Sequence, residues 1–417
     1  MRGSALAPLR NRNFALVFAA ALISNVGTWM ETVAVGDLVA DRTGQASWTA
    51  LVAAAGFLPM GLLGPIGGAV ADRLDRRKLV MTMTALQMVF AAGLVVASAT
   101  GHASPPVVAV LVFGAGCVAG LGFPAYSAML PDLVPEDQLL AAVSLTQAQW
   151  NLGRVVGPAL AGVAIALGSY TAAFAVNTVS FAAMLVALRA LQLAARPPST
   201  DTARLWARIR VGASAAWAEP GVRSAIVLIS VVALTASPFI ALIPAMARVR
   251  FDGDSSLTSR FVTAQGVGAV AGAFVLPALA ARFGRYRMLK ASFVALPVAL
   301  VLYGASPTPL LATFALVGVG ATYMFTFSGI GTVVQMRAPA ELRARVLSFY
   351  FLALGVLYPV GATLQGPIAD HLGLGQVTAL SGVALLLVVG IIRLVRPERL
   401  AALDDPVELS DVPVAVA

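Results

Sequence analysis

The sequence predicts an all-α membrane protein of twelve transmembrane helices, arranged as two pseudo-symmetric halves of six. Composition, the spacing of long apolar runs and the placement of basic residues lead to this fold class. Of the 417 residues, 59% are hydrophobic and only 11% are charged, and the mean hydropathy is +0.87. Soluble globular chains carry about 25% charged residues, so this chain has too little charge to cover a surface that faces water. Most of its surface is therefore expected to contact the lipid bilayer.

Twelve apolar runs are long enough to cross a membrane. A helix rises about 1.5 Å per residue and needs about 20 residues to span about 30 Å of hydrocarbon. Lipid offers no partner to unpaired backbone groups, so spanning segments are helices or strands of a closed barrel, and these runs lack the alternation of barrel strands. The expected helices cover residues 14–39, 48–71, 79–99, 106–130, 139–167, 171–193, 223–247, 256–281, 288–305, 309–335, 343–369 and 374–395.

Basic residues lie almost entirely on one side of the expected bundle. With the N-terminus inside, 23 of the 28 Lys and Arg residues fall in inside segments, four fall outside and Arg154 falls within an apolar run. Lys and Arg concentrate on the cytoplasmic side of membrane proteins. We therefore expect a multi-pass protein of the bacterial inner membrane with both termini in the cytoplasm. Because the charges cluster between apolar runs, the net charge of +9 does not indicate nucleic acid as a partner.

One longer polar segment divides the chain. Residues 194–222 carry Arg204, Arg208 and Arg210 interleaved with Trp206 and Ile209, a pattern that predicts an amphipathic helix on the anionic cytoplasmic leaflet. This linker separates an N-terminal half, residues 1–193, from a C-terminal half, residues 223–396. The acidic tail, residues 397–417, is expected to be disordered.

The two halves share a repeat. At a constant offset of 204 residues, prolines, serines and glycines recur: Pro135 with Pro339, Ser144 with Ser348, Gly157 with Gly361, and Gly162 with Gly366. Two parallel six-helix halves are a plan used by secondary transporters. The repeat therefore indicates a transporter.

The loop after the second apolar run reads Gly68-Ala-Val-Ala-Asp72-Arg73-Leu-Asp75-Arg76-Arg77-Lys78. It resembles the loop 2–3 signature of the major facilitator superfamily, which has glycine where this chain has Asp75. The resemblance implies a gating loop formed by Gly68, Asp72, Arg73, Arg76 and Arg77, in which Asp72 and Arg73 join a charge network that closes the cytoplasmic side. Positive charge that only orients the helices is the alternative.

The fifth apolar run contains Asn151-Leu-Gly153-Arg154-Val-Val-Gly157-Pro158-Ala-Leu-Ala-Gly162. It is similar to the Gly-Pro element of superfamily antiporters, which implies export in exchange for protons. Gly153 and Gly157 lie four residues apart and would let another helix approach closely, and Pro158 favours a kink. Ordinary packing of small residues is the alternative.

The stretch that precedes this element indicates a particular branch of the superfamily. Together with Asn151 and Arg154, it resembles the group that contains enterobactin exporters and macrolide efflux pumps: Gly122-Phe-Pro-Ala-Tyr126-Ser-Ala-Met-Leu-Pro131-Asp132-Leu-Val-Pro135-Glu136. Many drug exporters of the superfamily carry an arginine in the fourth helix, whereas residues 106–130 contain none. The coupling mechanism of those exporters is therefore not carried over to this chain.

Glu31 and Arg154 lie well inside the expected membrane spans, whereas Asp37 lies near the outer end of its span and about 120° around the helix from Glu31. Glu31 lies in a polar stripe with Asn25 and Thr28, and Arg154 lies in a stripe with Gln147 and Asn151, each stripe within about 120° of helix surface. Counted from the flanking charges, both lie roughly 25–29 Å from the cytoplasmic ends. We hypothesise that Glu31 and Arg154 pair in a central cavity and couple transport to protons. The alternative is a solvated Glu31 near the outer mouth and a structural Arg154.

Aromatic and hydroxyl side chains in the tenth and eleventh runs are candidates for the substrate wall. Tyr323 and Thr326 lie in the tenth run, and Tyr350 and Tyr358 in the eleventh. Aromatic rings with a few polar groups suit a bulky amphiphilic ligand. Packing or lipid-facing aromatics are the alternative for each.

The expected function is proton-coupled export of small amphiphilic molecules, such as antibiotics or siderophores, by a monomer that uses the proton gradient. No phosphate-binding loop, metal-ligand cluster or Ser/His/Asp arrangement appears in the sequence, so we expect no enzyme, metal or cofactor. The single cysteine, Cys117, allows no disulfide within the chain. An importer of the same fold and a transport-inactive membrane sensor are the alternatives.

Overall fold

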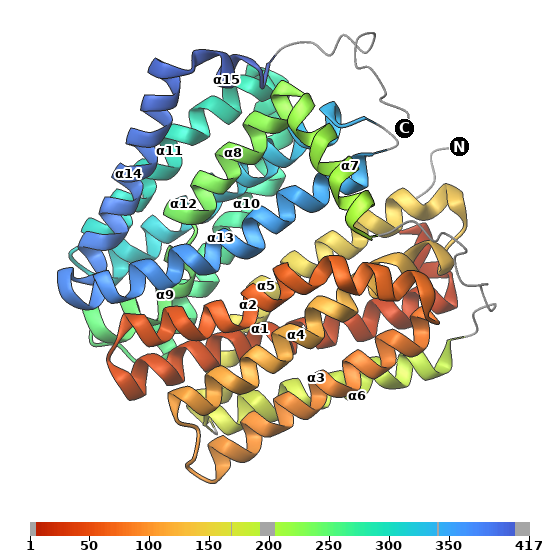
Figure 1. Ribbon diagram of the computed structural model, residues 1–417. Helices are drawn as coiled ribbons and strands as arrows, with labels where there is room; N and C mark the ends of the chain where they lie inside the picture. Colours follow the sequence, from red (N-terminus) through yellow and green to blue (C-terminus); the bar gives the residue numbers. More distant parts are fainter. Residues whose placement is uncertain (1–5, 168, 192–204, 340–341, 405–417) are drawn as a thin grey trace.

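The computed structural model describes residues 6–167, 169–191, 205–339 and 342–404 (Figure 1). Within these ranges all regular secondary structure is helical, and twelve helical segments are long and apolar enough to cross a membrane. The predicted fold class is therefore confirmed. Most helices extend a few residues beyond the predicted apolar runs, because polar and charged end residues such as Arg42 and Thr43 continue the helical hydrogen bonding.

The N-terminal half contains six long helices. They are α1 (Arg12–Thr43), α2 (Ala46–Arg73), α3 (Arg76–Ala99), α4 (Pro105–Met129), α5 (Leu139–Leu167) and α6 (Tyr170–Ala190). Helix α1 packs mainly on α5 and α6, and α4 packs between α2 and α3.

The C-terminal half repeats this arrangement, except that its first span is interrupted. Helix α8 (Pro220–Thr235), helix α9 (Phe239–Ala245) and a π-helical turn (Met246–Arg250) together make one crossing. The break falls at Ser237 and Pro238, because a proline has no N–H for the helical ladder. The remaining helices are α10 (Ser255–Phe283), α11 (Arg285–Ala305), α12 (Pro309–Arg337), α13 (Arg343–Leu372) and α14 (Leu374–Val395).

The bundle has two ends, which we call the termini face and the far face. At the termini face α1 begins at Arg12 and α14 ends at Val395; at the far face α1 ends at Thr43 and α14 begins at Leu374. Figure 1 shows the two halves converging near α9 and diverging towards α7 and the chain ends. Between described residues, every hydrogen bond or ion pair that joins the halves lies from mid-helix to the far face, as in Asp370 of α13 accepting from the backbone N–H groups of Ala46 (2.5 Å) and Ser47 (3.1 Å).

Glycines at repeat-related positions make equivalent contacts in the two halves. Gly157 of α5 packs on α1 against the carbonyl of Val26, and Gly361 of α13 packs on α8 against the carbonyl of Leu234. Across the interface between the halves, a Cβ at Gly162 would lie 2.8 Å from Ser259 of α10, and one at Gly366 would lie 2.8 Å from Ser47 of α2. The offset of 204 residues thus relates glycines that make equivalent helix–helix contacts in the two halves.

The two halves make a close backbone contact between Gly61 of α2 and Gly355 of α13. A Cβ at Gly355 would lie 2.7 Å from the Cα of Gly61. One turn or two further towards the termini face, a Cβ at Gly64 or Gly68 would meet no atom within 4 Å. The α2–α13 contact therefore ends near mid-helix, and the two helices separate beyond it.

Two segments outside the spans pack against the C-terminal half. The linker contains helix α7 (Leu205–Ala218), and its Ala216 is buried in the core of the C-terminal half; that this segment lies on the lipid leaflet stays a prediction. Part of the tail departs from the expected disorder: α15 (Pro397–Ala401) is helical, Leu403 is buried, and the hydroxyl of Tyr286 donates to the carbonyl of Leu400. Apolar residues at 400–403 explain this difference, since they cover the end of α11. The predictions for residues 192–204 and 405–417 lie outside the described residues.

We expect the substitution Gly355→Val to disrupt the contact between the halves. A side chain there would force α2 and α13 apart, and overpacking of this kind costs about 1–3 kcal/mol. The thermal unfolding midpoint of the purified protein should fall. The matched control is Gly318→Val on α12, where a Cβ meets no atom within 4 Å; equal effects of the two substitutions would show that the close approach is unimportant.

Candidate functional site

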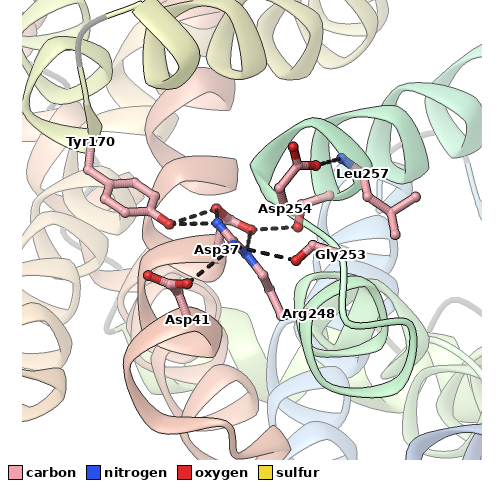
Figure 2. A network of polar contacts seen from close by, with 8 residues as sticks. Asp37, Asp41, Tyr170, Arg248, Gly253, Asp254 and Leu257 are labelled. Atoms are coloured by element: carbon pink, nitrogen blue, oxygen red, sulfur yellow. Dashed lines mark hydrogen bonds and ion pairs between the residues drawn. The ribbon is translucent and has the colours of Figure 1, made fainter.

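A buried carboxylate joins the halves at the far face. Asp37 of α1 is 0% exposed and accepts from Nε (2.8 Å) and Nη2 (2.6 Å) of Arg248 (Figure 2). The hydroxyls of Tyr170 (2.8 Å) and Thr258 (2.5 Å) also donate to Asp37. A carboxylate with a bidentate arginine and two hydroxyl donors is charge-assisted at every contact, which makes it strong and directional.

Local structure places the arginine of this network. The π-helical turn that follows Pro244 carries Arg248, and a Cβ at Gly36 would lie 2.8 Å from the ring of Pro244, so α1 and α9 approach closely here. Arg248 also contacts the carboxylate of Asp41 at 3.1 Å and donates to the carbonyl of Gly253. Asp254 caps α10 by accepting from the N–H of Leu257, which orients the first turn of α10.

Sequence reasoning did not find this network. It placed Asp37 near the outer end of the first span, about 120° around the helix from Glu31, and assigned no role to Arg248. Two features of the sequence could have indicated this network. They are an acidic residue within the first span of one half and an arginine of the other half on the outer side, where few basic residues lie. The π-helical turn that brings them together has no signature in the sequence.

Arg154 also links the halves, near mid-helix. Its Nη2 donates to Oε1 of Gln265 on α10 at 3.1 Å, and its guanidinium lies over the ring of Trp29 on α1, 5.8 Å from the centroid. Tyr323 and Tyr358 of the C-terminal half lie within electrostatic reach of the guanidinium. An arginine over a tryptophan ring gains a cation–π attraction that partly offsets the loss of water.

Glu31 lies apart from Arg154. Its carboxylate accepts from Nδ2 of Asn177 on α6 at 2.7 Å, and between described residues no ion pair joins Glu31 to Arg154. The predicted pair is therefore not formed in this conformation. The reason is angular: Trp29, which Arg154 covers, and Glu31 are two residues apart and point about 160° away from each other around α1. The prediction considered only how deep the two residues lie in the membrane. Their partners depend instead on which side of α1 each residue faces.

Several predicted cavity residues are packed instead. Asn25 is buried and donates to the carbonyls of Gln149 and Trp150, which ties α1 to α5. Thr326 is 0% exposed and donates to the carbonyl of Thr322, and Tyr350 is buried and donates to the carbonyl of Phe327. These side chains satisfy backbone carbonyls within the bundle, so the prediction that they line a cavity is wrong for this conformation.

The other predicted cavity residues retain some exposure. Thr28 and Gln147 are exposed, Asn151 and Tyr323 are partly exposed, and Tyr358 is 8% exposed with its ring edge-on to Phe57 at 5.4 Å. The hydroxyl of Tyr323 lies 3.1 Å from Oγ of Ser237 at the break between α8 and α9. The carbonyls of Leu234 and Thr235 at this break accept from Nε2 of Gln365. The interruption of this span thus borders Tyr323. The sequence analysis did not predict the interruption, although Pro238 was a signal for it.

The glycine element of α5 is a packing surface. Gly153 contacts Asn25, Gly157 contacts Trp29 and the carbonyl of Val26, and Gly162 contacts Ser259 of the other half. Pro158 is buried within the helix. The first two glycines hold α5 against α1, and this contact places Arg154 between the two halves.

The loop between α2 and α3 binds its own half in this conformation. Arg76 donates to the carbonyl of Ala128 (2.9 Å) and contacts Asp132 (3.4 Å). Arg77 donates to the carbonyls of Leu188 (2.7 Å) and Arg189 (2.8 Å). Arg73 is exposed and Gly68 is open, while the side chain of Asp72 lies outside the described part. Among described residues, no contact of this loop reaches the C-terminal half, so the predicted network that closes this face is untested.

Comparison with protein families places the chain. The family described as transmembrane secretion effector, within the major facilitator superfamily, matches residues 3–412. The chain belongs to this family. It is a multi-pass membrane transporter of the major facilitator type, embedded in lipid and acting on a small molecule.

Curated relatives and solved structures agree with this assignment. The chain is 28% identical over 414 residues to the multidrug efflux pump Tap of Mycolicibacterium fortuitum, covering 93% of this chain and 96% of that protein. It is 24% identical over 387 residues to macrolide efflux protein A of Streptococcus pyogenes, covering 89% and 93%. A POT family transporter in complex with 5-aminolevulinic acid superposes with a TM-score of 0.74 at 11% identity, over 93% of this chain and 97% of that one, which shows the shared fold.

The buried Asp37 network should control opening of the far face. In a Cys117→Ser background with Ser259→Cys as a reporter, we expect Asp37→Asn to raise the rate of labelling by a water-soluble maleimide about tenfold or more, since breaking a buried ion pair costs about 3–5 kcal/mol. Ser259 is buried against Gly162 between the halves.

The matched control is Asp41→Asn. Asp41 contacts the same arginine at 3.1 Å but is 47% exposed, so its loss should change labelling less than about twofold. Equal labelling rates for the two variants would show that the network does not hold the far face closed.

Proposed function

We propose that the protein exports small amphiphilic molecules, such as antibiotics or siderophores, from the cytoplasm in exchange for protons. The observation that carries the proposal is Glu31, an acidic residue inside a membrane span whose carboxylate accepts a hydrogen bond from the side-chain amide of Asn177. Ionisable groups are costly within membranes and serve there in ion and proton pathways. The names of the relatives, a multidrug efflux pump and a macrolide efflux protein, support the direction and the kind of substrate.

The surroundings of Glu31 suit a group that is protonated and released in turn. Asn177 is fully buried, and its Oδ1 accepts from Oγ of Ser180, so its Nδ2 is left to donate to Glu31. Glu31 itself is only partly buried, and Thr28 and Thr32 beside it are exposed. The carboxyl is thus held in one orientation at a polar, accessible strip of α1.

The conformation fits a step in which substrate is taken from the cytoplasm. With the basic residues on the cytoplasmic side, the termini face is cytoplasmic. The far face is then closed by the pair Asp37–Arg248 and by Asp370 of α13, which accepts from the first turn of α2, while the halves separate towards the cytoplasm. In alternating access, a substrate then enters between the halves and leaves when the contacts at the far face break.

The test is accumulation of antibiotics and dyes in an efflux-deficient host that expresses the protein, with and without a protonophore. We expect lower accumulation with the wild type, and loss of this effect with the protonophore or with Glu31→Gln. Glutamine can still accept from Asn177 but carries no titratable proton. Asp41→Asn, an acid of the same helix at the far face, is the control and should retain export.

Each other result has a separate meaning. Export that survives Glu31→Gln at full strength would discard Glu31 as the proton carrier and keep the exporter. Raised accumulation of a compound on expression would favour an importer of the same fold. No change for any compound tested would favour the membrane sensor.

A further inference from the structure

Arg154 is a membrane-embedded cation with no acidic partner in the part of the chain that the structure describes. Among described residues, no carboxylate lies within 4.0 Å of its guanidinium, and the hydrogen-bond partner recorded for it is the neutral amide of Gln265. The other arginine between the halves, Arg248, contacts two carboxylates. A cation inside a membrane bundle that is not paired is costly and is a candidate for ligand binding.

The immediate neighbours of Arg154 add donors and no negative charge. Nε1 of Trp29 and Nε2 of Gln265 are buried N–H donors that have no acceptor in this conformation. Burying a hydrogen-bond donor without an acceptor is unfavourable, since the donor loses its water partner and gains none. Arg154 thus contacts two side chains that each carry a further donor, and an oxyanion is the kind of group that accepts hydrogen bonds from such donors.

Aromatic rings border this donor cluster. Tyr323 and Tyr358 lie within electrostatic reach of the guanidinium, and Tyr323 stacks on Phe327 with ring planes 15° apart. Tyr358 presents its ring to the edge of Phe57. Aromatic rings near a charged centre suit a flat hydrophobic body attached to the anion.

We propose that Arg154 binds the carboxylate of an aromatic amphiphilic substrate, with Trp29 and Gln265 as further donors. The inference rests on the proposed transport function and specifies its substrate class as organic acids. A cationic compound would meet the repulsion of the guanidinium at low dielectric, so it is a poorer ligand of this centre. Arg154 bridges α5 and α10 through Gln265, so a bound carboxylate competes for a bond that joins the two halves.

The test compares dansylglycine with its uncharged methyl ester, which share the aromatic body and differ in the carboxylate. Binding to the purified full-length protein in neutral detergent is measured by equilibrium dialysis against protein-free detergent. We expect the wild type to bind the acid at least about tenfold more tightly than the ester, because the charge-assisted hydrogen bonds of the carboxylate are lost with the ester. The ratio should fall to about one in Arg154→Gln, whereas Arg154→Lys should retain part of it.

The controls separate this site from general charge effects. Arg393→Gln removes an exposed arginine at the end of α14 and should leave the wild-type ratio unchanged. Trp29→Phe keeps the ring and removes Nε1–H, so it should reduce the ratio without abolishing it; if Arg154→Gln does not fold, this variant and Arg154→Lys carry the test.

Equal binding of acid and ester by the wild type, or an unchanged ratio in Arg154→Gln, would overturn the proposal. The dialysis uses no proton gradient. It can therefore fail while proton-driven export by the same protein holds, and it can succeed while export fails.

Discussion

The closed state depends on one desolvated carboxylate. Asp37 has no exposed surface and receives donors from α6, the π-helical turn and α10, so three elements of the two halves are oriented by one group. Removing a partner from a buried ion pair leaves a charge without compensation, which costs far more than the intact pair contributes to stability. A latch of this kind therefore opens only when water or a rearranged partner reaches Asp37, and it makes the closed and open arrangements discrete states.

Glycine determines where the rest of the interface can form. Helices of opposite halves touch without intervening side chains at several glycines. These are Gly61 against Gly355, and Gly162 and Gly366 against serines of the other half. Lipid provides no hydrophobic drive for helices to associate, so close backbone packing and polar contacts supply the attraction. Because these glycines lie from mid-helix to the far face, the attraction is concentrated at one end, and the two halves can rock about it.

The helical architecture could be predicted from the sequence, because apolar runs of about 20 residues have few other solutions in lipid. The repeat also held at the level of contacts, as Gly157 and Gly361 show. The hydrogen-bond and ion-pair partners of individual side chains could be predicted less well from the sequence. Glu31 and Arg154 share a depth but face opposite sides of α1, and Thr326 bonds to its own helix. The network at Asp37 depends on a π-helical turn and on contacts 211 residues apart in the chain, which no local pattern records.

In the mechanism that we propose, Glu31 and Arg154 have separate roles, whereas the sequence analysis expected a single charge pair to couple transport to protons. A salt bridge between Glu31 and Arg154 would neutralise both and leave neither free for a ligand. Apart, the carboxyl on the α6 side of α1 can take a proton, and the guanidinium on the α5 side can take an anion. The two sites share α1 as their common wall, with Asp37 further along the same helix. In the mechanism that we propose, a shift of α1 on binding of either ligand would act on the buried latch and so couple protonation, substrate binding and opening through one rigid element.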